Sequence, residues 1–212
     1  MWTTMKGPLS KAIREREDIK NNSEMSKFAE MVSREILIDN ITPAIADEID
    51  HLIRIWNEMD DEKEILFAER KPIKIYIDSY GGNMPAALTI MDSINMSRTP
   101  IYTINIGCVY KESFWVYLMG HKRYCYPDAT FMYHKNIPPF DEQEQSQEST
   151  FYNYTSFWNK QEEELKRILI DKTKITETQY EKHSKNDWWF VSDDALKLRI
   201  CNDISRSHSF KN

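Results

Sequence analysis

Two apolar segments, residues 73–77 and 101–106, flank a stretch with helical periodicity, and this alternation most limits how the chain can fold. The first segment ends in the turn Ser79-Tyr80-Gly81-Gly82, where two adjacent glycines favour a tight reversal. Apolar residues then recur at helical spacing: Ala87, Ile90, Met91 and Ile94. The order strand, helix, strand predicts an α/β fold of stacked βαβ units around a mostly parallel sheet.

A second strand and helix precede this unit. Residues 36–38 form a short strand candidate, and Thr42-Pro43 is typical of a helix N-cap followed by proline in the first turn. The apolar residues after it mark one helical face: Ile45, Ile49, Leu52, Ile53, Trp56 and Met59. Residues 60–72 are predicted to be a charged connection.

The chain after residue 106 predicts further short elements. We expect a turn over Gly107–Lys111, a short buried helix over Glu112–Met119, and strands over 123–126 and 130–134. The polar, proline-bearing residues 136–149 indicate a loop. A long helix follows, with one apolar side: Phe151, Tyr154, Trp158, Leu165, Ile168 and Leu169. Two short helices are expected near 176–184 and from a Ser192 cap to about Arg199.

Composition excludes several classes of protein. The formal net charge is −6, which disfavours general nucleic-acid binding. No apolar run approaches the roughly 20 residues that span a bilayer, and Met1–Lys20 has no secretory signal pattern. The three cysteines are odd in number and widely spaced, which favours free buried thiols in a reducing compartment over a metal site. We therefore expect a cytoplasmic protein without a membrane span, metal or cofactor.

Glycine is scarce, with only 5 in 212 residues, so each is expected where the backbone needs it. The polar residues 1–32 are predicted to be a flexible N-terminal segment, residues 33–205 a single domain and residues 206–212 a tail.

Three blocks of sequence resemble the proteolytic subunit of the Clp protease. The first, KPIKIYIDSYGG, is similar to the family's I-Y-L-Y-I-N-S-P-G-G. The second, GHKRYCYPDATFMYHKN, is similar to G-x-K-R-Y-x-L-P-N-x-x-x-M-I-H-Q-P. The third, NDWWFVSDDALKLRICNDI, resembles D-R-x-F-x-S-A-x-E-A-x-x-Y-G-L-I-D. The resemblance covers roughly residues 33–205 and implies a ClpP/crotonase-like fold with a protruding handle helix at about 146–173.

The resemblance also implies a serine-peptidase site. A nucleophile of this kind needs a base, an acid that orients the base, and N–H donors for the oxyanion. His134 falls at the position of the base, Asp187 at that of the acid, and Gly82 at an oxyanion-hole glycine. The second oxyanion donor is the backbone N–H after the nucleophile, which is that of Glu112.

The sequence departs from the family at the nucleophile itself. The family has A-A-S-M-G where this chain has Val109-Tyr110-Lys111-Glu112-Ser113, so Lys111 takes the position of the serine. A lysine amine is protonated near neutral pH unless it is desolvated. Ser113 is an alternative nucleophile, but in a regular helix residues two apart point to nearly opposite sides. Ser113 would reach His134 only if the turn shifted by two residues.

Three functions remain open. The chain is a catalytically impaired subunit with a structural or regulatory role, or an active ATP-dependent serine endopeptidase using Ser113, His134 and Asp187. A third, weaker hypothesis is a crotonase-like acyl-CoA enzyme. The resemblance implies self-association into heptameric or stacked rings. It implies as partners an active ClpP paralogue or a Clp ATPase unfoldase, and a polypeptide substrate if the site is active.

Overall fold

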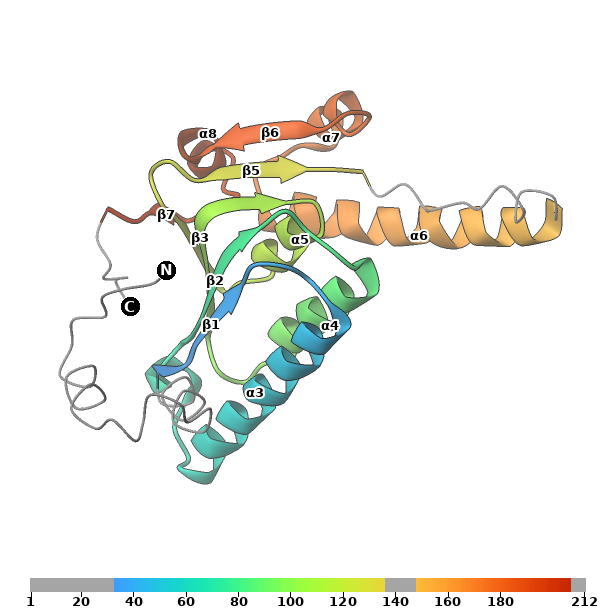
Figure 1. Ribbon diagram of the computed structural model, residues 1–212. Helices are drawn as coiled ribbons and strands as arrows, with labels where there is room; N and C mark the ends of the chain where they lie inside the picture. The colour runs from blue at the N-terminus through green and yellow to red at the C-terminus, as the bar shows by residue number, and fades with distance from the viewer. Residues whose placement is uncertain (1–32, 136–147, 207–212) are drawn as a thin grey trace, which may run out of the picture. The chain divides into compact units, whose positions relative to one another are not determined.

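The computed structural model describes residues 33–135 and 148–206, and its centre is a seven-stranded sheet (Figure 1). The described residues from Ile36 on belong to one compact unit. The strands are β1 (Glu35–Ile38), β2 (Ile73–Ser79), β3 (Ile101–Tyr110), β4 (Lys122–Cys125), β5 (Thr130–Tyr133), β6 (Trp188–Val191) and β7 (Asp203–Ile204). The helices are α3 (Pro43–Glu62), α4 (Met84–Asn95), α5 (Glu112–Leu118), α6 (Glu148–Lys172), α7 (Glu177–His183) and α8 (Ser192–Lys197), with a short 3₁₀ helix η2 (Phe67–Glu69).

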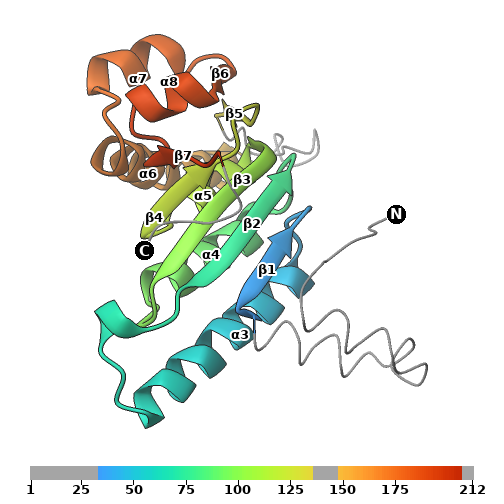
Figure 2. The same cartoon turned by 90° about the vertical axis from the view of Figure 1, so that its left-hand side faces the viewer.

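The sheet is mostly parallel, as the strand–helix–strand pattern predicts. Its main order is β1-β2-β3-β4-β7, and β5 pairs with β3 and with β6. The β2/β3, β3/β4, β3/β5 and β4/β7 pairs are parallel, and β5/β6 is antiparallel. Figure 2 shows α3 and α4 on one side of the β1–β2–β3 part of the sheet. The predicted α/β fold is confirmed.

The predicted helix faces pack as their periodicity requires. Thr42 caps α3 by accepting a hydrogen bond from the Ile45 N–H (3.3 Å). Ile49, Ile53 and Trp56 from α3 are at most 2% exposed and join one core with the inward side of the sheet. The opposite face of the sheet carries a small second cluster: Tyr102, Ile104 and Tyr124.

The predicted turn at Gly107–Lys111 is wrong, because β3 continues to Tyr110. Its first half pairs with β4 and its second half, from Cys108, pairs with β5. A Cβ atom at Gly107 would lie 2.4 Å from an Asp78 carboxylate oxygen, so glycine lets the strand pass this side chain. A partner distant in sequence therefore overrides the local turn preference of glycine.

Other boundaries differ from the predictions. Helix α3 extends to Glu62 and η2 follows, so part of the charged connection is helical. Val191, not Ser192, occupies the N-cap position of α8, and the Ser192 hydroxyl instead donates to the Pro127 carbonyl oxygen. Strands β6 and β7 were not predicted, since each is short and forms through pairing with a distant strand.

Helix α6 is the predicted long helix. Near its C-terminal end, Leu165 and Leu169 are buried in the core, while its N-terminal part extends beyond the sheet (Figure 1). The predicted loop lies outside the described residues except for its last two positions, which are helical. The prediction of a protruding handle helix is thus confirmed, with Glu148–Lys172 as its bounds.

Candidate functional site

Lys111 lies at a sharp turn between β3 and α5. Its backbone has φ 51° and ψ −123°, a combination that residues other than glycine rarely adopt. Two hydrogen bonds hold the turn, from the Lys111 N–H to the Met132 carbonyl (3.1 Å) and from the Phe114 N–H to the Lys111 carbonyl (3.0 Å). This is the strand–turn–helix geometry that presents a nucleophile in hydrolases. Within the described residues, the exposed Lys111 side chain has no hydrogen bond or ion pair.

His134 and Asp187 are brought together by strand register. His134 directly follows β5 and Asp187 directly precedes β6, and Tyr133 lies opposite Trp188 in this antiparallel pair. The next residues outward therefore face each other, and His134 Nδ1 lies 2.6 Å from Asp187 Oδ1. Both side chains are partly exposed, at 32% and 46%. Their catalytic roles stay a prediction.

His183 does not take part in this pair. It ends α7, and its ring stacks on that of Trp188 with the centroids 4.5 Å apart. It therefore packs beside β6, the strand that begins directly after Asp187.

Ser113 points into the protein. It is fully buried, and its Oγ accepts a hydrogen bond from the Tyr110 N–H (2.9 Å). The carbonyl oxygens of Ser79 (2.9 Å) and Tyr110 (2.7 Å) lie within reach of its hydroxyl proton. The hydroxyl thus ties the start of α5 to the ends of β2 and β3. Within the described chain it makes no hydrogen bond to His134, so the structure does not bring these two residues together.

The glycine turn after β2 is held against the start of α3. The Ile41 N–H donates to the Gly81 carbonyl (3.1 Å), and the Asn83 N–H donates to the Ile41 carbonyl (2.9 Å). Gly82 has φ +153°, and a Cβ atom there would lie 2.2 Å from the Ile41 oxygen. Only glycine fits this position without a shift of the backbone.

The Glu112 side chain enters the site, which sequence reasoning missed. The Gly82 N–H donates to Glu112 Oε2 at 2.9 Å. The resemblance assigned a role to the backbone N–H of Glu112, whereas the observed contact uses its carboxylate. A carboxylate beside the nucleophile position was the available indication, because the family has small or apolar residues there.

Aromatic side chains lie on the other side of the Lys111 turn. Tyr110 contacts Tyr80 and Trp189 edge to face, with ring centroids 5.4 Å and 5.1 Å away. The Tyr110 hydroxyl lies 2.7 Å from Thr130 Oγ1, which fixes the ring between its neighbours. Tyr80 and Trp189 are exposed, so these rings form an apolar surface next to Lys111.

The cysteine thiols lie inside the protein. All three cysteines are free and buried, as expected from their spacing. Burial, together with the nearby Asp78 carboxylate, raises the pKa of the Cys108 thiol to about 11. Across residues 33–135 and 148–206, no group of three or more His, Cys, Asp or Glu side chains could hold a metal ion.

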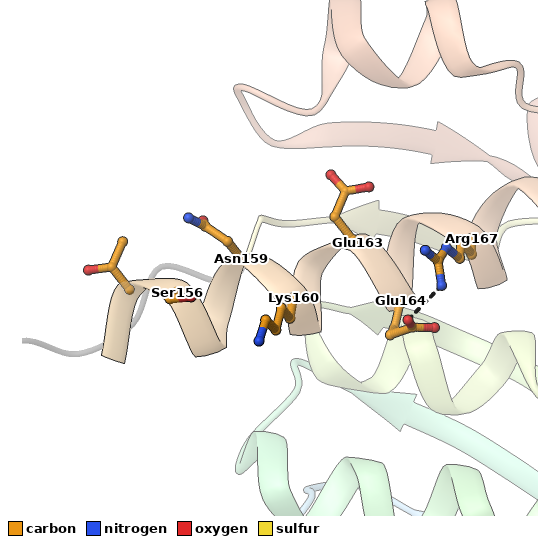
Figure 3. Close-up of a pocket in the computed structure, with 7 residues that line it drawn as sticks. Ser156, Asn159, Lys160, Glu163, Glu164 and Arg167 are labelled. Atoms are coloured by element: carbon orange, nitrogen blue, oxygen red, sulfur yellow. Dashed lines mark hydrogen bonds and ion pairs between the residues drawn. The ribbon is translucent and has the colours of Figure 1, made fainter. Parts of the chain in front are cut away.

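A hollow of about 470 Å³ lies along the outer part of α6 (Figure 3). It is polar, and an ion pair between Glu164 and Arg167 (2.7 Å) lies at one end. It includes none of the residues around Lys111 or His134, so the candidate site is the β3–α5 turn with its neighbours and not this hollow.

The comparisons with known proteins agree on one family. The sequence model described as Clp protease matches residues 36–208. The chain is 28% identical to "ATP-dependent Clp protease proteolytic subunit 2" of Borreliella burgdorferi over 68% of this chain and 73% of that protein. It is 27% identical to "ATP-dependent Clp protease proteolytic subunit" of Streptococcus mutans over 66% and 72% of the two chains. No helix among the described residues has the length and apolar character of a membrane span.

Proposed function

Because the chain belongs to the Clp protease family, we propose that it is a ring-forming subunit whose own peptidase site is impaired and whose role is structural or regulatory. The observation that carries this proposal is the residue at the β3–α5 turn. Lys111 takes the strained position from which a nucleophile is presented, and its side chain is exposed to water, where a lysine amine is ordinarily protonated near neutral pH. A protonated amine has no lone pair with which to attack a peptide carbonyl.

A deprotonated Lys111 would not restore turnover. Attack by its amine on a peptide carbonyl would form a new amide and release the amine of the cleaved substrate. An amide is as resistant to hydrolysis as the original peptide, so the acyl group would remain on the enzyme. Peptide hydrolysis proceeds through a serine because the ester intermediate is easier to hydrolyse.

The alternative is an active endopeptidase that uses Ser113, His134 and Asp187. The 2.6 Å pair of His134 and Asp187 would suit it. The position of Ser113 argues against it, because the side chain is fully buried and its hydroxyl is committed to backbone groups. Freeing this hydroxyl would require the first turn of α5 to rearrange and leave the Tyr110 N–H without its partner.

A fluorophosphonate probe and a fluorogenic peptide test the two functions. We expect neither labelling nor hydrolysis by the wild-type protein, with an active Clp protease subunit as positive control. Labelling of the wild type that is lost in Ser113→Ala and in His134→Ala would instead establish the endopeptidase. Circular dichroism of each variant ensures that loss of labelling is not loss of fold.

The proposed assembly rests on family membership and on α6. The N-terminal part of this helix extends beyond the sheet (Figure 1), and Phe157 of this helix is 56% exposed, so it offers a second subunit an apolar side chain to cover. We propose heptameric or stacked rings in the cytoplasm, alone or together with an active ClpP paralogue, and a Clp ATPase as a docking partner. Sedimentation of the purified protein should give a mass several times the 25.3 kDa of one subunit. A monomer at micromolar concentration, with or without the paralogue, would contradict the proposal.

A further inference from the structure

The carboxylate of Glu112 occupies the hydrogen-bond donor that faces the candidate site. Glu112 is the first residue of α5, directly after Lys111, and its Oε2 lies 2.9 Å from the Gly82 nitrogen. The acceptor is therefore supplied by the chain itself.

The N–H groups on either side of Gly82 already have hydrogen-bond acceptors. The Gly81 N–H donates to Ser79 Oγ (3.2 Å), and the Asn83 N–H donates to the Ile41 carbonyl (2.9 Å). Of the Gly81, Gly82 and Asn83 N–H groups, the Gly82 N–H is thus the one directed at the start of α5. Since the Glu112 carboxylate accepts from it, a bound substrate would find this donor occupied.

The backbone is shaped closely around this carboxylate. A Cβ atom on Gly81 would lie 2.4 Å from Glu112 Oε2 and 3.0 Å from Lys111 Cβ, and Gly81 has φ +112°. The absence of a side chain at Gly81 is what allows Glu112 to approach. The contact therefore depends on the shapes of both segments and not on one rotamer of an isolated glutamate.

An N–H group that stabilises an oxyanion also binds a carboxylate oxygen, because both are negatively charged acceptors. A substrate carbonyl is neutral in the ground state and is a weaker acceptor. The Glu112 carboxylate is moreover tethered, so its local concentration at Gly82 is high, on the order of millimolar or above. A peptide would have to displace a stronger acceptor that cannot diffuse away.

We propose that Glu112 is an internal ligand of the Gly82 oxyanion donor, so that the site is closed to peptides independently of the missing nucleophile. This inference rests on the proposed function and deepens it, since it gives the site two separate blocks. A serine introduced at position 111 would therefore remain largely inactive until the carboxylate is also removed.

Three variants separate the two blocks: Lys111→Ser alone, Lys111→Ser with Glu112→Ala, and Lys111→Ser with Glu112→Gln. The probe reaction forms a serine Oγ–phosphorus bond, releases fluoride and transfers the hydroxyl proton to His134. We expect the Ala variant to be labelled at least about tenfold faster than Lys111→Ser alone, because one oxyanion donor contributes roughly 10²–10³ in rate. The Gln variant is the matched control, since it retains the size of Glu112 but has only a neutral, weaker acceptor oxygen, and its rate should lie between the other two. Equal rates in all three would overturn the proposal.

A second measurement does not depend on activity. With only five glycines, labelling glycine with ¹⁵N and carbonyl ¹³C gives a simple amide spectrum, in which Gly82 is assigned as the one glycine that follows another glycine. In Glu112→Ala, the Gly82 amide proton should shift upfield and exchange faster with solvent, with Glu112→Gln in between. A Gly82 amide that is unchanged in Glu112→Ala would overturn the inference even if no variant is labelled. Wild-type labelling on Ser113 would contradict only the proposed function and leave the amide result to decide this one.

Discussion

His134 Nδ1 lies 2.6 Å from Asp187 Oδ1, although 53 positions separate the two residues in the chain. The contact follows from the antiparallel pairing of Tyr133 with Trp188, which places the next residue of each strand face to face. A carboxylate at Nδ1 favours the tautomer with the proton on that nitrogen and leaves Nε2 free to accept a proton. This orientation of the imidazole is the one required of a general base.

The first prediction concerns this tautomer. In Asp187→Ala, the neutral His134 ring should lose its preference for the Nδ1–H form, because the acceptor that selects that form is gone. ¹⁵N-histidine spectra distinguish the two tautomers among the five histidines. Asp128→Ala, an exposed aspartate in the β4–β5 turn, serves as control. An unchanged His134 tautomer in Asp187→Ala would show that another group orients the ring.

Ser113→Ala should lower the free energy of unfolding by roughly 1–3 kcal/mol, because it leaves the partly buried Tyr110 N–H without an acceptor. The hydroxyl also lies within 2.9 Å of the Ser79 carbonyl, so β2 loses a tie to α5. Urea denaturation followed by circular dichroism measures the change. A variant as stable as the wild type would indicate that Ser113 has no structural role and would reopen the case for it as a nucleophile.

Arg123 joins β4 to the ends of two helices. Its guanidinium is almost fully buried and donates to the carbonyl oxygens of Ile200 (2.7 Å), Lys172 (2.8 Å) and Arg199 (2.9 Å). Arg123→Met keeps much of the volume but leaves these three acceptors without their donor. We expect the free energy of unfolding to fall by about 3 kcal/mol or more.

Lys197→Ala is the matched control for Arg123, because it removes an exposed cation whose ion pair with Asp194 is long (3.5 Å). Its effect on urea denaturation should stay below about 0.5 kcal/mol. Equal effects of the two substitutions would contradict the role given to Arg123.

Glu162 connects α6 to β5, the strand that ends directly before His134. The hydroxyls of Tyr133 (2.9 Å) and Tyr180 (2.6 Å) both donate to its Oε1, and burial raises the pKa of both phenols. Glu162→Ala should destabilise the protein by about 2 kcal/mol, because the Tyr180 hydroxyl loses its acceptor and the Tyr133 hydroxyl keeps only its bond to the Tyr180 oxygen (3.2 Å). Thermal denaturation measures the change, and Glu163→Ala, at the neighbouring position on α6, is the control. A smaller loss for Glu162→Ala than for Glu163→Ala would refute the connection.

Cys108 should react slowly with iodoacetamide near pH 8, since burial and the Asp78 carboxylate raise its pKa to about 11. The thiolate is the reactive form, so the rate should rise with pH until it levels off near that value. Asp78→Asn removes the negative charge and should lower the pKa of Cys108. Each pKa unit by which it falls should make the reaction at pH 8 about tenfold faster. Asp92→Asn on α4 should leave the rate unchanged. A rate already independent of pH near 8 would contradict the raised pKa.

Much of the fold follows from local patterns. The apolar spacing along α3 and α4 and the alternation around β2 and β3 indicate which side of each element is buried, and Thr42 marks where α3 begins. These features depend on residues close in sequence, so they can be predicted without knowing which distant segments pack against them. The positions of His134 and Asp187 as a pair follow from family resemblance, since nothing local links residues so far apart.

The sequence alone shows that a lysine stands at the β3–α5 turn, because its position follows from counting residues within the family motif. The same count raises the question of whether the site is active. The contacts around that turn depend on packing between distant segments. The pairing of Cys108–Tyr110 with β5 extends β3 past its expected end. The inward orientation of Ser113 follows from where β2 ends. The Glu112 carboxylate meets Gly82 because β2 and β3 are neighbours. Residue types limit which groups can donate or accept a hydrogen bond, but which donor meets which acceptor is decided when the sheet brings segments some 30 residues apart within 3 Å of each other.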